Sequence, residues 1–85
     1  MPYQIIIERT AQKEIQKINH TDQASIIQAI LELANEPRPT GCKKLKGREA
    51  WRIRVDNYRV IYEIQDNILV VTVITVGHRR NVYKK

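Results

Sequence analysis

The chain has 85 residues, of which 42% are hydrophobic and 28% are charged, and its formal net charge is +6. This length suffices for one domain, residues 1–85, with a single two-layer core. The composition excludes an intrinsically disordered chain. The positive charge indicates an acidic partner, such as nucleic acid or an acidic protein.

The first half of the chain predicts one strand followed by two helices. Residues 3–7 are rich in β-branched side chains, which is typical of a strand. Thr10 is expected to cap a short helix, because apolar residues recur after it at helical spacing. Thr21 or Asp22 is expected to cap a second helix, which ends before Pro37. Its wide apolar stripe suits packing on a sheet.

The second half predicts strands only. Residues 51–62 form a hairpin through the two-residue turn 56–57, whose Asp and Asn both tolerate a left-handed backbone. A second two-residue turn at 66–67 leads into residues 68–76, which are apolar on both faces and therefore suit a central strand. The predicted fold is α+β with the order β-α-α-β-β-β. Two N-terminal helices pack on one face of an antiparallel sheet, and the other face stays open.

The alternation of side chains along the hairpin places Arg52, Arg54 and Arg59 on the open face. The aromatic residues of the hairpin fall on the helix-covered face, where we expect them in the core. A two-residue turn sets Arg54 directly opposite Arg59, with Cβ atoms roughly 5 Å apart. Like charges in that arrangement destabilise a hairpin. The arrangement therefore indicates a face that binds an anion such as phosphate.

The C-terminal segment after Gly77 adds further candidates. They are His78, Arg79, Arg80 and Tyr83. With a two-residue turn at 66–67, Arg59 would lie opposite Ile74, and this segment would emerge close to the Arg54 end of the sheet. That would bring a side chain that titrates near neutral pH close to the cations that bind phosphate.

A basic segment precedes the hairpin, and we expect it to attract the phosphate backbone of a nucleic acid. It contains Lys43, Lys44, Lys46 and Arg48. Residues 1–42 carry a net charge of −1 and residues 43–85 carry +7, so the second half should hold the partner surface. We expect neither a metal site nor another cofactor, because Cys42 and the two histidines do not have ligand spacing.

The chain is expected to act in the cytoplasm and not at a membrane. Cys42 is the single cysteine, which excludes an internal disulfide and favours a reducing compartment. The longest apolar stretch, 68–76, falls well short of the roughly 20 residues that a spanning helix needs. No apolar run near the N-terminus follows a basic stretch, so no signal peptide is expected.

Four sequence motifs together resemble the RelE/ParE toxin superfamily, and its RelE branch in particular. They are KLKG at 44–47, WRIR at 51–54, YRVIY at 58–62 and GHRRNVY at 77–83. The resemblance covers essentially the whole chain and implies a microbial-ribonuclease-like fold. It also implies the toxin of a type II toxin–antitoxin system, an mRNA interferase that cleaves messenger RNA in the ribosomal A site. A cognate antitoxin would neutralise it.

Family positions and local chemistry together define a candidate catalytic set. It consists of Arg52, Arg54, Arg59, His78, Arg79 and Tyr83, with Arg80 added to the RNA-binding residues of the basic segment. RelE-type members often carry lysine at the positions of Arg52 and Arg54. A guanidinium binds phosphate but cannot act as a base, so His78 becomes a candidate for proton transfer. Tyr83 could transfer protons or stack on a base.

Two classes of function remain open. The first is the ribosome-dependent endoribonuclease, which the retention of Arg59, Arg79 and Tyr83 favours. The second is a ParE-like toxin without nuclease activity that inhibits a protein such as DNA gyrase. In both, an acidic segment of the antitoxin is expected over the arginine face. Operator DNA is expected to be bound only through the antitoxin complex.

Overall fold

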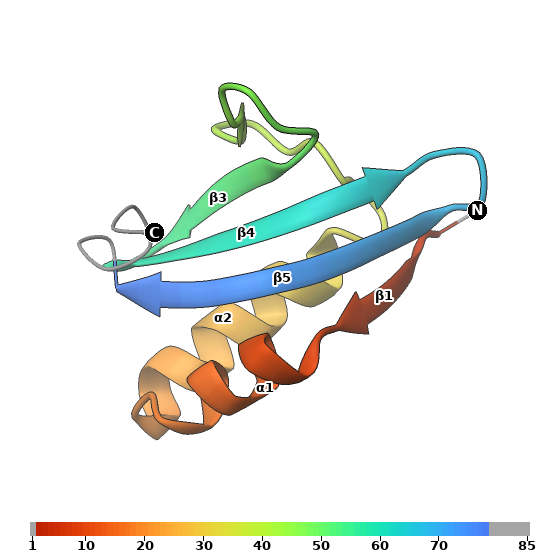
Figure 1. The fold of residues 1–85 in the computed structure, drawn as a ribbon. Coiled ribbons are helices and arrows are strands. Elements are labelled where there is room, and N and C mark those ends of the chain that lie inside the picture. Colours follow the sequence, from red (N-terminus) through yellow and green to blue (C-terminus); the bar gives the residue numbers. More distant parts are fainter. Residues whose placement is uncertain (1, 79–85) are drawn as a thin grey trace.

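The structure, a computed structural model, describes residues 2–78, and over this range two helices cover one face of a five-stranded sheet (Figure 1). The elements are β1 (Gln4–Ile7), α1 (Arg9–Gln16), α2 (His20–Glu32), β2 (Lys43–Lys44), β3 (Trp51–Val55), β4 (Tyr58–Gln65) and β5 (Val70–His78). The strand order is β1-β5-β4-β3-β2. The α+β fold with two helices on one sheet face is therefore confirmed. Within residues 2–78, neither helix is long and apolar enough to cross a membrane.

The sheet is mixed, and the prediction of a purely antiparallel sheet is wrong at one edge. β1 runs parallel to β5, with Gln4 aligned to Val70. A parallel pair needs a long connection between its strands, and here the helices and three further strands supply it. β5 consequently lies between β1 and β4, as its apolar residues on both faces predict. The two-residue strand β2 was not predicted.

Both helices begin earlier than the sequence indicates. Glu8, and not Thr10, is the N-cap of α1. Asn19 caps α2: its side-chain oxygen accepts a hydrogen bond from the Asp22 backbone N–H at 2.9 Å, and its amide donates to the Asp22 carboxylate at 2.9 Å. Asparagine is as good an N-cap as the threonine or aspartate that follow it, so the sequence alone could not decide between neighbouring candidates.

The core lies between the two helices and the facing side of the sheet. Its fully or almost fully buried members include Ala11, Ile15, Ile26, Ile30, Val60, Tyr62, Val71, Val73 and Val76. Trp51 and Tyr58 are half-buried at its margin, so the predicted placement of the hairpin aromatics is confirmed. The Tyr62 hydroxyl donates a hydrogen bond to the carbonyl of Pro37 at 2.7 Å. Burial raises the pKa of Tyr62 well above its ordinary value.

A polar cluster joins the N-terminal strand to the β4–β5 turn. Asp66 accepts hydrogen bonds from the Tyr3 hydroxyl at 2.6 Å and from the Arg38 guanidinium at 2.9 and 3.2 Å. Arg38 also lies over the Trp51 ring, 4.9 Å from its centroid. The hydrogen bonds from Arg38 and then Tyr3 lower the pKa of Asp66 to about 2.

Candidate active site

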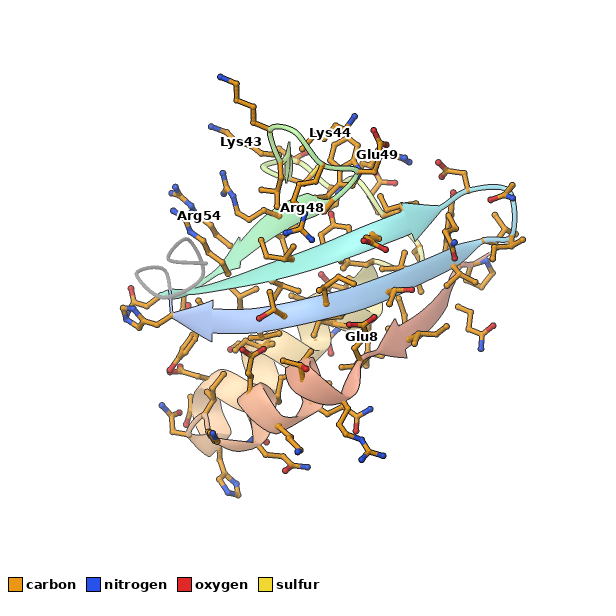
Figure 2. The ribbon with its side chains drawn as sticks, viewed as in Figure 1. Glu8, Lys43, Lys44, Arg48, Glu49 and Arg54 are labelled. Atoms are coloured by element: carbon orange, nitrogen blue, oxygen red, sulfur yellow. The ribbon has the colours of Figure 1, made fainter. Side chains whose placement is uncertain are left out.

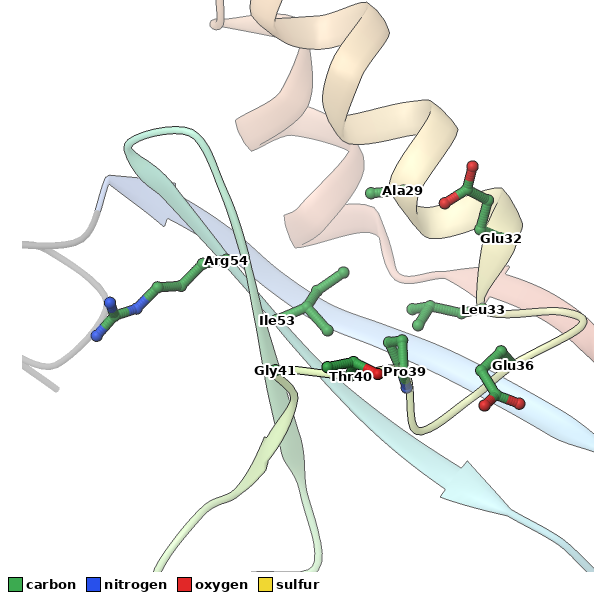
Figure 3. Close-up of a pocket in the computed structure, with 9 residues that line it drawn as sticks. All are labelled: Ala29, Glu32, Leu33, Glu36, Pro39, Thr40, Gly41, Ile53 and Arg54. Atoms are coloured by element: carbon green, nitrogen blue, oxygen red, sulfur yellow. The ribbon is translucent and has the colours of Figure 1, made fainter.

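The hairpin β3–β4 places its arginines as the alternation predicts. Arg54 is aligned directly with Arg59, and Asp56 in the connecting turn has the left-handed φ of 54°. Figure 3 shows the Arg54 side chain extending away from Ile53 and from α2. Arg52 lies two residues before Arg54 and shares its face. The predicted like-charge pair on the face away from the helices is therefore confirmed.

This arginine face (Arg52, Arg54 and Arg59) is less open than predicted. Arg52 is only 6% exposed and Arg59 only 7%, whereas Arg54 is exposed. At their positions Arg52 is flanked by β2 and β4, and Arg59 by β3 and β5. Among the described residues 2–78, Arg54 has a paired strand on the β4 side only. A ligand that approaches this face therefore meets Arg54 first.

Arg52 places positive charge beneath the surface of this face. Within the described part of the chain, the Nε atom of Arg52 is buried and has no hydrogen-bond partner. Lys43 of β2 pairs directly with Arg52 and so shares its face. Burying a cation is costly unless an opposite charge balances it. The pairing of Arg52 with Lys43 therefore favours an anion at this part of the face.

The end of β5 lies beside the arginine face, but in a register that differs from the predicted one. Arg59 is opposite Gly77, and not opposite Ile74. The β4–β5 turn occupies residues 66–69, with Leu69 at a left-handed φ of 55°, so β5 begins at Val70 and not at residue 68. A bulge in the β4–β5 pairing, between Ile61 and Tyr62 of β4, shifts the register of β5 by one further residue.

The irregularity in β5 is held by Glu14 of α1. One Glu14 carboxylate oxygen accepts hydrogen bonds from the Thr75 hydroxyl and the Val76 backbone N–H, both at 2.8 Å. Without the extra residue, Val76 would stand opposite Arg59 and turn an apolar side chain toward the arginine face. The bulge puts Gly77 there instead. Glu14 was not predicted, although it falls on the helical stripe that runs through Ala11.

His78 reaches the expected end of the sheet but faces the other side. It is aligned with Tyr58, and their rings meet edge to face with centroids 5.9 Å apart. Directly paired residues share a face, and Tyr58 packs against the core on the helix side. The imidazole is therefore separated by the sheet from Arg54 and Arg59, so the predicted meeting of these side chains in one area is wrong.

The basic segment before β3 lies at the β2 edge of the sheet. Lys43, Lys44, Lys46 and Arg48 are all exposed. Lys44 forms an ion pair with Glu49 at 3.0 Å. Lys43 pairs with Arg52 and so shares the arginine face, and Figure 2 shows both lysines at the β2 edge of the molecule. The segment thus extends the positive charge of the arginine face along this edge.

Three candidates, Arg79, Arg80 and Tyr83, lie outside the described residues, and their roles stay predictions. Within residues 2–78, no group of three or more histidine, cysteine, aspartate or glutamate side chains could hold a metal ion.

Comparison with known proteins identifies the family and the relatives to which this chain is similar. Residues 5–83 match the family described as ParE toxin of type II toxin-antitoxin system. The chain is 30% identical to "Toxin RelG" of Mycobacterium tuberculosis over 88 residues, covering 100% of both chains. It is also 30% identical to "mRNA interferase toxin RelE" of Escherichia coli K12 over 82 residues, covering 93% of this chain and 85% of the relative.

Solved structures show the same fold. The RelBE2 toxin–antitoxin complex of Mycobacterium tuberculosis contains a chain that matches with a TM-score of 0.83 and 26% identity, covering 93% of this chain and 100% of the other. The intact RelBE complex of Escherichia coli matches with a TM-score of 0.78 and 29% identity, covering 89% and 95%. In both structures the similar protein is part of a toxin–antitoxin complex.

Proposed function

Because this chain belongs to the family of ParE toxins of type II toxin–antitoxin systems, we propose that it is a ribosome-dependent endoribonuclease neutralised by a cognate antitoxin. The relative from Escherichia coli is named an mRNA interferase. The observation that carries the proposal is the direct opposition of Arg54 and Arg59, beside the paired cations Lys43 and Arg52. Such a face suits the phosphate backbone of RNA.

The reaction proposed is attack of the ribose 2′-hydroxyl on the adjacent phosphorus. A bond forms between the 2′-oxygen and phosphorus, the bond to the 5′-oxygen breaks, and the 2′-hydroxyl proton is removed while the 5′-oxygen gains one. Arg54, the exposed member, contacts the phosphate. Arg52 and Arg59 stabilise the developing charge from beneath it, and Arg79 joins them on family grounds. A preorganised donor of this kind lowers a barrier by about 2–4 kcal/mol.

Proton transfer needs a group other than the arginines, because a guanidinium does not deprotonate. His78 packs on Tyr58 across the sheet from Arg54. Tyr83 is therefore the proposed proton carrier among the residues of this chain. A site with so few proton-transfer groups depends on orientation of the substrate, which a ribosome-bound message supplies.

The proposal also defines partners and location. Ribosomes and messages are cytoplasmic in a microbial cell, so the toxin acts there on the message in the ribosomal A site. An acidic segment of the antitoxin covers the arginine face, since that face is cationic and its Arg54 is exposed. Operator DNA is bound only through the toxin–antitoxin complex.

The proposed nuclease is tested by comparing cleavage of a translated message with cleavage of the same RNA without ribosomes. The purified chain should cut the translated message far faster, and Arg54→Ala should lose most of that activity. Glu63→Gln, a change at an exposed carboxylate of β4, serves as the matched control and should cut normally. Rapid cleavage of naked RNA would contradict dependence on the ribosome.

The second candidate is a ParE-like toxin without nuclease activity that inhibits a protein such as DNA gyrase. It is favoured by the matched family, which is described as ParE toxin. If the chain cuts RNA neither with nor without ribosomes, and inhibits supercoiling by purified gyrase, this second function replaces the first.

A further inference from the structure

The bulge in β5 lies in the strand that ends beside the arginine face. Ile61 of β4 pairs with Thr75, and the next residue of β4, Tyr62, pairs with Val73. Within the described part of the chain, Ile74 between them has no partner residue in β4. A bulge of this kind interrupts the ladder and changes the face of every residue beyond it. Bulges are frequent next to active sites, where they re-aim side chains.

On its other side, β5 is paired with β1 only up to the bulge. The last pair of these two strands is Ile7 with Val73. The Glu8 N–H then donates to the Val73 carbonyl at 3.0 Å, and the chain turns into α1. From there on α1 lies beside β5 (Figure 1). The backbone groups of β5 that point away from β4 in this part therefore face a helix.

Glu14 of α1 accepts the hydrogen bonds that β5 offers at this point. Its Oε1 accepts from the Thr75 hydroxyl and from the Val76 backbone N–H, both at 2.8 Å. Its Oε2 lies 3.0 Å from the same hydroxyl. Ala11 and Ile15, which flank Glu14 on α1, are buried and hold the helix against the core. One carboxylate thus takes the place that a neighbouring strand would have beside β5.

The contact determines which residue of β5 stands beside Arg59. The Val76 N–H that binds Glu14 points away from β4, so the backbone groups of the next residue, Gly77, point toward β4 and pair with Arg59. Gly77 contributes no side chain to the arginine face. If β5 slipped by one residue, Val76 would stand there, with its Cβ roughly 5 Å from that of Arg59. The bulge therefore keeps an aliphatic side chain away from Arg59.

Burial alone does not secure this register. Val76 is 1% exposed, so the core favours the same face for its side chain. Apolar packing leaves the outward N–H of Val76 unsatisfied, however, and an unpaired backbone group away from water costs as much as a lost hydrogen bond. Beyond Val76, Gly77 is half-buried and His78 is exposed, so packing contributes little at the end of β5. Glu14 therefore holds this end of the strand on the α1 side.

We propose that Glu14 is a positioning residue of the active site. It acts through β5, by holding the end of this strand in the register that sets Gly77 beside Arg59. The chain that continues from this end carries the candidates Arg79 and Tyr83. The inference rests on the proposed nuclease function. Loss of Glu14 should lower the rate of cleavage and leave binding of the message almost unchanged.

The first measurement is cleavage of a translated message by the unmodified chain, Glu14→Ala and Glu14→Gln, at a temperature where denaturant unfolding shows each to be folded. The kcat of Glu14→Ala should fall about tenfold to a hundredfold, as a misplacement of about 1 Å implies. Its KM should change little, because the basic segment at the β2 edge is untouched. Glutamine keeps an oxygen that can accept both hydrogen bonds, so Glu14→Gln should retain most of the rate. Glu32→Ala, the same replacement at an exposed carboxylate of α2, is the matched control and should cut normally.

The second measurement reads the register by NMR in the free chain and needs no RNA. Val60 and Val76 are paired, and their backbone groups point away from each other, so their Cα atoms lie about 4.5 Å apart and their Hα atoms are in contact. This contact should be present in the unmodified chain and in Glu14→Gln, and weakened or lost in Glu14→Ala. In Glu14→Ala the Gly77 N–H should also exchange at least about tenfold faster.

A third variant tests whether Glu14 acts through this contact. Thr75→Val removes one of the two donors to Glu14 and keeps a branched side chain. It should lower kcat by a smaller factor than Glu14→Ala. The double variant Glu14→Ala/Thr75→Val should be no slower than Glu14→Ala, since both changes act on one contact. If Glu14→Ala does not fold, Thr75→Val decides by the same two measurements.

The proposal requires that kcat and the register change together. A lowered kcat with an unchanged Val60–Val76 contact overturns it, as does a lost contact with an unchanged kcat. An unmodified chain that cuts no RNA refutes the proposed nuclease, and the NMR measurement then decides by itself. In that case loss of the contact in Glu14→Ala supports Glu14 as the residue that positions the end of β5, and its retention overturns this role.

Discussion

Replacing Arg54 by glutamine should stabilise the fold while it removes activity. Arg54 stands directly opposite Arg59 in the β3–β4 pair, and like charges in that position cost about 0.2–1 kcal/mol. Glutamine keeps a long polar side chain and removes one of the two charges. For a domain of this size, the expected rise in melting temperature is about 1–8 °C.

The source of this stabilisation is tested by salt and by a charge-preserving variant. Urea unfolding of the unmodified chain, Arg54→Gln and Arg54→Lys is measured at 0.05 M and 1 M NaCl. The advantage of glutamine should shrink at high salt, since the screening length falls to about 3 Å at 1 M. Arg54→Lys keeps the charge and should gain little stability.

Activity on a translated message completes the test. Arg54→Gln should lose cleavage and Arg54→Lys should retain more of it than Arg54→Ala, because charge at the phosphate matters more here than guanidinium geometry. A glutamine variant that is less stable than the unmodified chain, or whose advantage does not depend on salt, would refute the electrostatic reasoning. Equal loss in the lysine and alanine variants would show that bidentate contact is required.

Four further outcomes are expected. Arg59→Ala should abolish growth arrest while the protein still unfolds cooperatively; normal growth arrest on its induction would argue against the site. Tyr62→Phe should cost about 1–2 kcal/mol, because the Pro37 carbonyl loses its 2.7 Å donor; Tyr58→Phe is the control for denaturant unfolding. The pKa of Asp66 is lowered from 3.8 to about 2, so its interactions stabilise the fold above pH 3.8 and are lost as the pH falls to about 2; Asp66→Asn should flatten this part of the stability profile, and an unchanged profile would contradict it. Binding of single-stranded RNA should weaken with salt at a log–log slope near −3, as about four phosphate contacts imply; a slope near zero in a titration would exclude a mainly electrostatic contact.

Several features of the site follow from local sequence alone. The period of two along β3 and β4 assigns each side chain to one face, and the two-residue turn with Asp56 at positive φ sets the pairing of Arg54 with Arg59. Both effects act over a few residues, so no knowledge of the rest of the fold is needed. The charge difference between the two halves of the chain likewise depends on the sequence only.

Other features depend on residues that are distant in the sequence. Burial of Arg52 and Arg59 follows from the strand order, which places a neighbour on each side of them. The position of Gly77 opposite Arg59 requires the bulge that Glu14 holds through Thr75, 61 residues away. The alternation of side chains along a strand contains no information about which residues of two strands pair. It therefore cannot reveal a register shift that a side chain from another element imposes. The face of each arginine was therefore determined by the sequence, whereas its exposure and its neighbours across the sheet were decided by the tertiary structure.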